Sequence, residues 1–100
     1  MEITKSQCGG KVTFALSGRL DANASPQFQA DLIPTFDEAG FVELDLAALT
    51  YVSSAGLRVL LLGEKTAKAK GAVMSLRNVS QDIKEIFDMT GFSDILNIVA

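Results

Sequence analysis

Two adjacent hydroxyl side chains, Ser53 and Ser54, are the residues of this chain best placed for chemistry. They lie between an apolar stretch that begins at Leu44 and a leucine-rich run at residues 55–62. This pattern predicts a buried strand, a sharp corner and the first turns of a helix. A serine at such a corner is open to solvent and faces the positive end of the helix dipole. It can therefore carry a phosphate without disrupting the fold.

The chain has few residues that could support other kinds of catalysis. The chain has no histidine, which removes the commonest general base and every histidine-based metal site. Asp21 and Asp45 could in principle share acid and base work, but Asp21 suits a turn cap and Asp45 suits a strand-edge or helix-facing acid. Gly9-Gly10 belongs to a hairpin, and Gly56 is not followed by the Gly-Lys-Ser/Thr of a phosphate-binding loop. We expect no catalytic residue, cofactor or metal, and a nucleotide-binding module or NTPase is the weakest alternative.

Length and composition limit the class of protein. One hundred residues with 48% apolar side chains fit one domain over residues 1–100. A net charge of −3 without a Lys/Arg cluster argues against nucleic acid as a partner. The single cysteine, Cys8, suits a reducing cytoplasm. No apolar run approaches the roughly 20 residues of a membrane-spanning helix, and the first residues lack a signal-peptide pattern. We expect a cytoplasmic protein with no membrane insertion.

Periodicity and helix breakers divide the rest of the chain into strands and helices. Gly9-Gly10 has the backbone freedom of a tight hairpin. Ser25 followed by Pro26 predicts the cap and first position of a helix, whose second half Pro34 should disturb. The expected strands cover residues 2–7, 11–17, 41–46 and 72–77, and the expected helices cover residues 26–38, 55–70 and 81–90. Gly71 and Gly91 predict the ends of the second and third helices, and Ser80 predicts the cap of the third.

This order of elements predicts an α/β fold. Strand–helix alternation implies parallel strands with right-handed crossovers, and the opening hairpin adds an antiparallel contact. The result is a mixed four-stranded sheet covered by three to four helices. Within the second helix, Glu64 and Lys68 have the spacing of an ion pair. The apolar tail, residues 92–99, should pack back onto the domain.

Several segments carry a family resemblance. Residues 16–22 read Leu-Ser-Gly-Arg-Leu-Asp-Ala and residues 44–46 read Leu-Asp-Leu. Residues 51–61 contain Ser-Ser-Ala-Gly-Leu-Arg-Val-Leu-Leu, and residues 79–98 include a Thr-Gly-Phe triplet. Together, and in this order, they resemble the STAS domain of bacterial anti-sigma factor antagonists over essentially the whole chain. The resemblance implies the STAS fold and a regulator that is not an enzyme.

The resemblance also implies a site. In that family the antagonist binds a serine kinase that doubles as an anti-sigma factor. Phosphorylation of a serine at the start of the helix after the third strand inactivates the antagonist, and a serine phosphatase resets it. On this chain that serine is Ser54. Ser53 stands where the family often has aspartate, so it is a possible alternative acceptor. The expected partner-binding residues are Asp21, Ser53, Ser54, Gly56 and Arg58, and Arg58 shares a helix face with Ser54.

Plainer interpretations stay open beside this one. A serine at a helix start commonly caps the helix, and Ser53 is the better candidate for that role. Gly56 could serve only close packing of helix on sheet, and Arg58 could be a solvated charge. The rival function is a non-switching STAS subunit, such as a scaffold in a stress-signalling complex or part of a lipid or anion transporter. In such a subunit the corner would be only a docking edge.

Overall fold

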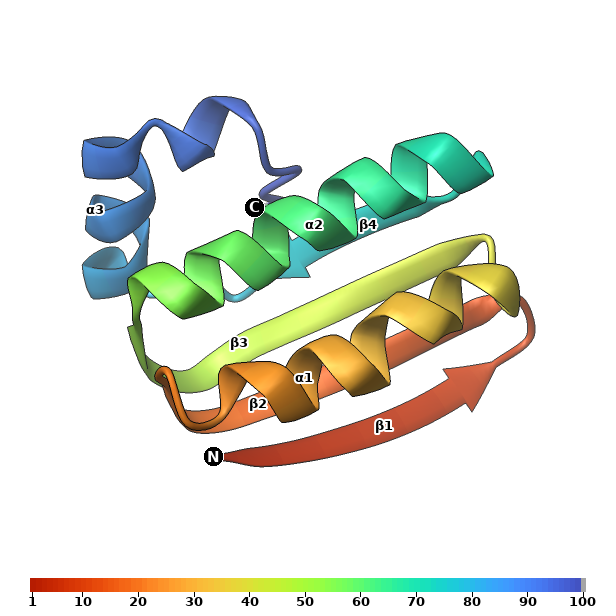
Figure 1. The fold of residues 1–100 in the computed structure, drawn as a ribbon, viewed down its shortest axis with the longest axis horizontal. Helices are drawn as coiled ribbons and strands as arrows, with labels where there is room; N and C mark the ends of the chain where they lie inside the picture. The colour runs from red at the N-terminus through yellow and green to blue at the C-terminus, as the bar shows by residue number, and fades with distance from the viewer. Residues whose placement is uncertain (100) are drawn as a thin grey trace.

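The computed structural model describes residues 1–99 and contains a mixed four-stranded sheet in the order β1-β2-β3-β4 (Figure 1). β1 is antiparallel to β2, whereas β2–β3 and β3–β4 pair in parallel. The prediction of an α/β fold with a mixed sheet is confirmed. The strands are β1 (Glu2–Cys8), β2 (Lys11–Leu20), β3 (Phe41–Val52) and β4 (Val73–Arg77).

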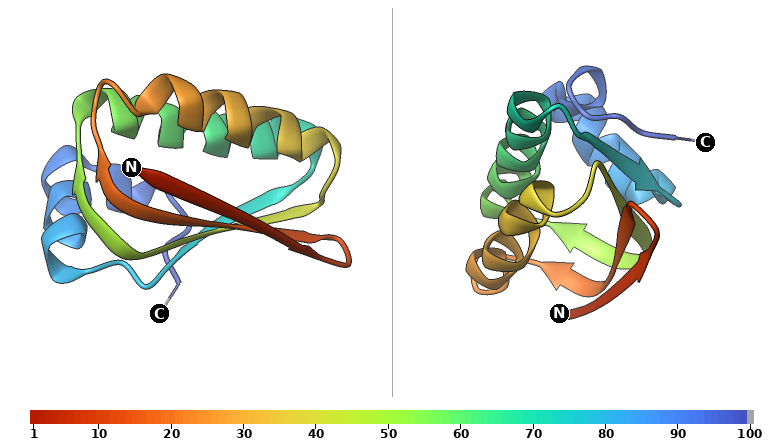
Figure 2. Two further views of the ribbon diagram at one scale, coloured as in Figure 1. Left: turned by 90° about the horizontal axis from the view of Figure 1, so that it is seen from below. Right: turned by 90° about the vertical axis from the view of Figure 1, so that its right-hand side faces the viewer.

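Two helices run side by side over one face of this sheet. They are α1 and α2, and Figure 2 shows both on the same side of the strands. A third helix, α3, lies at the end of the sheet beside the start of α2 and contacts β3. The helices are α1 (Ser25–Leu32), α2 (Ser54–Lys70) and α3 (Gln81–Thr90), with 3₁₀ turns η1 (Ile33–Asp37) and η2 (Phe92–Asp94).

The core lies between the sheet and these helices. Alternate residues of β2 and β3 point the same way because the parallel register pairs Val12 with Val42 and Phe14 with Leu44. These side chains meet the apolar stripes of α1 and α2 in one cluster. Its members with at most 1% exposure include Val12, Phe14, Leu16, Phe28, Leu32, Val42, Leu44, Leu46 and Leu60.

The opposite face of β3 carries a buried charge that the sequence pattern did not indicate. Glu43 is 6% exposed. Its carboxylate oxygens lie 3.3 Å from Nζ of Lys11 and 3.2 Å from Nη1 of Arg77, on the two neighbouring strands. A buried carboxylate needs such partners to offset its lost hydration. This ionic group therefore links β2, β3 and β4 across the face that α1 and α2 leave open.

β2 and β3 are longer than expected. The expected ends were residues 17 and 46, but β2 continues to Leu20 and β3 to Val52. Gly18 does not break the strand, because its φ of 97° and the register shifts on either side of it form an irregularity within the ladder. The hydroxyl of Thr50 donates to the carbonyl of Gly18 at 2.9 Å and supports this arrangement. The extra pairing carries both strands up to the Ser53 corner.

The first helix confirms one expectation and corrects another. The α-helical part ends at Leu32 and continues as η1, as the position of Pro34 predicted. Ser25 is not the N-cap: that position is Ala24, and the Ser25 hydroxyl donates to the carbonyl of Asp21 at 2.6 Å. The side chain of Asp21 holds the preceding turn instead, which makes a serine cap unnecessary.

The ends of α2 and α3 agree with the sequence. Each helix stops at a left-handed glycine, Gly71 with φ 70° and Gly91 with φ 79°. Ser80 caps α3 by accepting a hydrogen bond from the amide of Ile83 at 3.3 Å. The tail packs back as expected, with Ile98 forming a parallel bridge to Leu76.

Glu64 departs from its predicted role on α2. The side chain is only 8% exposed, whereas Lys68 is exposed. Within residues 1–99 the two form no ion pair, and Oε1 of Glu64 finds no hydrogen-bond partner. The expected pair is therefore wrong, because Glu64 faces the buried side of α2 rather than its solvated side.

We predict a pH-dependent contribution from Asp45. Hydrogen bonds from the Asn78 side chain at 3.0 Å and the Ala47 amide at 3.1 Å lower the pKa of Asp45. The stability that this provides is present above the unfolded pKa of about 4 and is lost as pH falls through the lower folded pKa. Asn78→Gly keeps the left-handed backbone at φ 56° and removes the donor. It should raise the pKa of Asp45 in an NMR titration and destabilise the fold by about 0.5 kcal/mol at pH 7.

The destabilisation should shrink as pH falls below about 4 and disappear below the lowered folded pKa, where Asp45 is protonated in both states. The Asp88 carboxyl on α3 is the internal control, since its pKa is lowered by hydrogen bonds from Lys84 and Ser93 and its titration should be the same in both proteins. An unchanged Asp45 titration in Asn78→Gly would contradict the assignment.

Candidate functional site

The start of α2 is fixed by Ser53. Its backbone is extended, with φ −84° and ψ 172°, and its hydroxyl oxygen accepts a hydrogen bond from the amide of Gly56 at 3.2 Å. Its carbonyl accepts the first helical bond, from Leu57 at 2.9 Å. Ser53 is therefore the N-cap, as the plainer interpretation of this residue predicted.

Ser54 is the first residue of α2, and it is exposed. The capping bonds satisfy the amide of Gly56 and leave those of Ser54 and Ala55 without a partner in the helix. These amides and the helix dipole create a positive electrostatic field at this end of α2. The hydroxyl of Ser54 is thus accessible and lies where added negative charge is tolerated.

Gly56 is buried beneath this corner. A Cβ atom on Gly56 would lie 2.7 Å from Cγ of Leu20 and 2.8 Å from the Leu20 carbonyl oxygen. The same carbonyl accepts a hydrogen bond from the amide of Ser53 at 2.9 Å. Only glycine fits so close to the end of β2. Gly56 is therefore not part of the exposed surface, but the close packing that it permits determines where Ser54 lies.

Asp21 lies in the loop that follows Leu20. One carboxylate oxygen accepts hydrogen bonds from the amides of Asn23 at 3.1 Å and Ala24 at 2.9 Å, which makes Asp21 the turn cap that the sequence suggested. The side chain is partly exposed. The Leu20 carbonyl, directly before Asp21, accepts the hydrogen bond from the Ser53 amide. This bond holds the Asp21 loop close to the Ser53–Ser54 corner.

The structure does not bring Asp21 and Asp45 together. Asp45 pairs in register with Ala15, whereas Val52 pairs with Leu20 directly before Asp21. Five residues of strand separate those two positions on β2, which is about 16 Å. Asp45 instead accepts the hydrogen bonds from Asn78 and Ala47. An acid–base pair built from these two aspartates is therefore excluded.

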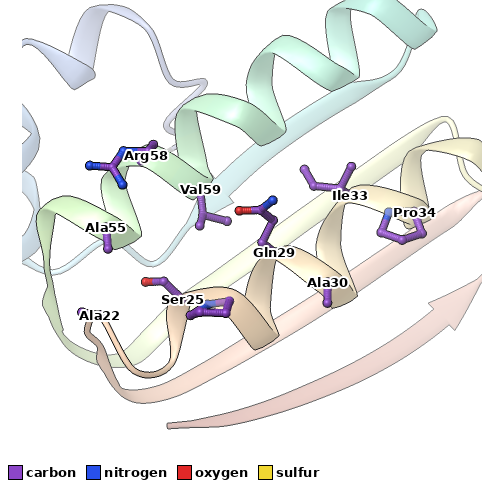
Figure 3. Close-up of a pocket in the computed structure, with 10 residues that line it drawn as sticks. Ala22, Ser25, Gln29, Ala30, Ile33, Pro34, Ala55, Arg58 and Val59 are labelled. Carbon is purple, nitrogen blue, oxygen red and sulfur yellow. The ribbon is translucent and has the colours of Figure 1, made fainter.

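A groove adjoins the corner and runs between α1 and α2. Its volume is about 590 Å³. Figure 3 shows Gln29 and Val59 facing each other across it, while Arg58 extends from α2 at its upper edge. The lining residues are Ala22, Ser25, Pro26, Gln29, Ala30, Ile33 and Pro34 on one side and Ala55, Arg58 and Val59 on the other.

Sequence reasoning missed the α1 side of this surface. Small or apolar residues recur every four positions there, at Ala22, Pro26, Ala30 and Pro34, and all four are exposed. They lie beside the buried stripe that contains Phe28, so the sequence held a second apolar helical face. This spacing alone does not indicate which element lies opposite the α1 face, because the other wall of the groove comes from α2.

Arg58 is the charged member of the groove lining. It is exposed, and within residues 1–99 no carboxylate lies within ion-pair distance of its guanidinium. Side chains on a helix lean toward its amino end, which brings Arg58 toward Ser54 one turn earlier. The surface thus combines an accessible hydroxyl, a helix start and a cation.

The described part of the chain, residues 1–99, has neither a metal-binding cluster nor a membrane-spanning helix. Over residues 1–99, no group of three or more side chains from Cys, Asp or Glu is gathered in a way that could hold a metal ion. No helix in that range has both the length and the apolar composition needed to span a bilayer.

Comparison with known proteins gives a consistent result. The STAS domain family profile matches residues 2–100. The chain is 31% identical over 99 residues to BtrV of Bordetella bronchiseptica, which is provisionally named an anti-sigma factor antagonist. This match covers 98% of this chain and 85% of BtrV. It is 29% identical over 85 residues to the anti-sigma-B factor antagonist of Bacillus subtilis, covering 85% of this chain and 78% of that protein.

Solved structures show the same fold. The anti-sigma factor antagonist SpoIIAA in its unphosphorylated form superposes with a TM-score of 0.80 at 17% identity, over 99% of this chain and 88% of that one. The phosphorylated form of SpoIIAA from Bacillus gives a TM-score of 0.78 at 18% identity, over 99% and 92%. At such identities the likeness concerns the fold alone.

Replacing each of the two serines by alanine should change the stability of the protein by different amounts. Ser53→Ala removes the cap of α2 and should lower the free energy of unfolding by about 1 kcal/mol. Ser54→Ala removes an exposed hydroxyl that caps nothing and should change it by less than about 0.5 kcal/mol. Urea denaturation of both variants and the wild type checks this. Equal losses, or a larger loss for Ser54→Ala, would contradict the division of roles.

Proposed function

Because the chain belongs to the STAS domain family, we propose that it is an anti-sigma factor antagonist that binds an anti-sigma factor serine kinase and is inactivated by phosphorylation of Ser54. Binding would free a sigma factor for transcription, and a serine phosphatase would restore the active form. In this proposal the protein acts in the cytoplasm and catalyses no step of its own. Its contact surface comprises Asp21, Ser53, Ser54 and Arg58, with Gly56 beneath them.

The observation that carries the proposal is the contrast between the two serines. The oxygen of Ser53 is engaged by the Gly56 amide, whereas Ser54 is exposed and caps nothing. A kinase can reach Ser54 without opening the helix. Relatives named as antagonists, and SpoIIAA with the same fold in both phosphorylation states, support the same role.

The physics of the switch follows from the position of Ser54. A phosphoserine carries roughly −1.5 to −2 charges at pH 7 and accepts hydrogen bonds strongly. The free amides of the first turn and the guanidinium of Arg58 can receive it, so the isolated protein tolerates the change. A docked partner that had covered a neutral hydroxyl would instead meet a desolvated dianion. The penalty is about 3 kcal/mol, or a hundredfold in affinity.

Phosphorylation is the decisive experiment. The kinase to use is an anti-sigma factor ATPase from the same genome, and one whose gene neighbours the gene for this chain would be the first choice. Incubated with that kinase and ATP, the wild type should gain the mass of one phosphate, and Ser54→Ala should gain none. Ser53→Ala is the matched control and should still be labelled. An unlabelled wild type would favour the non-switching scaffold, and equal labelling of Ser54→Ala would remove Ser54 as the acceptor.

A charge at residue 54 should weaken binding while sparing the fold. Ser54→Asp should lower affinity for the kinase about a hundredfold, because the carboxylate is buried in the complex. Its melting temperature should stay within a few degrees, since an acid in the first turn suits the helix dipole. Ser54→Asn is the control for size without charge and should bind more tightly than Ser54→Asp. Calorimetric titration measures the affinity of the wild type and of both variants for the kinase. Equal affinities for Ser54→Asp and Ser54→Asn would rule out an electrostatic switch.

A further inference from the structure

The groove between α1 and α2 continues the surface of Ser54 away from the corner. At one end are Ala55 and Arg58, which flank the phosphorylation position, and at the other are Ile33 and Pro34. Arg58 supplies its charge at the first end. Apart from Ser25 and Gln29, the remaining lining is apolar. An occupant that matches this groove has an acidic group at one end and apolar side chains along the rest.

The groove is too open to enclose a small molecule. Ligand pockets bury most of their ligand's surface. Here most residues of the α1 wall, including Pro26, Gln29 and Ala30, are exposed, and so is Arg58 on the other wall. The groove runs along the outer side of two neighbouring helices (Figure 3). A segment of another protein, lying lengthwise, can cover it.

The walls also select the backbone conformation of that segment. Both walls are helical, so beyond the first turn of each helix their backbone groups are already hydrogen-bonded within α1 and α2. An extended segment would leave its own amides and carbonyls unpaired against such walls. A helix satisfies its backbone internally and can place apolar side chains in a groove at three- and four-residue spacing. The eight residues of α1 are about 12 Å long, which matches roughly two turns of such a helix.

We propose that this groove receives an amphipathic helix of the anti-sigma factor partner, with an acidic side chain of that helix paired to Arg58. The inference rests on the proposed function and identifies the part of the partner that is recognised. It also explains how phosphate on Ser54 disrupts the complex. The phosphate stands one helical turn from Arg58, so it competes for the same guanidinium and repels the acid that had paired with it.

The test places a bulky cation in the groove away from Ser54. Ala30 is exposed on α1, and arginine is a good helix former, so Ala30→Arg should fold normally. It should weaken binding of the anti-sigma factor kinase about tenfold or more, because its side chain fills the space of the partner helix. The matched control is Ala69→Arg, an exposed position on α2 outside the groove, where affinity should stay within about twofold.

Arg58→Gln tests the ion pair independently. It should weaken binding and also flatten the salt dependence of the affinity, because one attractive charge pair is lost. Backbone NMR spectra of labelled wild type with added kinase give a further measurement. The amide signals of Gln29 and Ala30 should shift together with that of Ser54, whereas that of Ala69 should not.

The outcomes separate the two proposals. If wild type is bound and labelled at Ser54 but Ala30→Arg binds equally well and the Gln29 signal is unmoved, the groove proposal is wrong and the proposed function stands. If the affinity of Arg58→Gln for the kinase depends on salt as strongly as that of the wild type, the proposed ion pair between Arg58 and an acidic side chain is wrong. A wild type that the kinase neither binds nor labels would overturn both.

Discussion

The site depends on one close contact, between the carbonyl of Leu20 at the end of β2 and the first turn of α2. The amide of Ser53 donates to this oxygen at 2.9 Å, and the backbone of Gly56 passes so near that a Cβ atom would lie 2.8 Å from it. Any side chain at position 56 would push the helix away from the strand. Because Asp21 follows Leu20 directly, the same contact places the Asp21 loop beside the start of α2.

That contact also explains why two neighbouring serines have different roles. Ser53 turns its oxygen inward to the amide of Gly56 and holds the helix start. Ser54, one residue on, lies outside this bonding and is exposed. A covalent change at Ser54 therefore leaves the cap intact. In the proposed mechanism, regulation and stability therefore belong to different hydroxyls, so a modification of Ser54 can alter binding without unfolding the helix.

The rest of the molecule makes this corner rigid. The core under α1 and α2 and the ionic group around Glu43 connect the strands on both faces of the sheet. α1 is anchored by Phe28 and Leu32, which leaves its neighbouring small-residue face free beside α2. The proposed docking groove is thus a consequence of how two buried helix stripes pack on the sheet. Its charge at Arg58 is local, in a chain whose net charge is −3.

The elements could largely be predicted from the sequence, because their signals are local. Alternation located the strands, Ser80, Gly71 and Gly91 marked helix ends, and Pro34 marked the change from α to 3₁₀ geometry. Strand ends were less predictable. Whether Gly18 ends a strand or forms an irregularity within it depends on the partner strand, which residues 16–22 do not specify alone. Ser25 failed as a cap because Asp21, four residues earlier, already held the turn.

The sequence by itself determined an exposed hydroxyl at a helix start, the absence of histidine chemistry and the likeness to a family. Tertiary structure decided which serine is the cap, why residue 56 must be glycine, and that α1 and α2 together form a groove reaching Arg58. It also buried Glu43 between two cations and turned Glu64 inward. The physical reason is the same throughout. Periodicity reports which face of an element is apolar, but the partner that meets each face lies far away in the chain and is known only after folding.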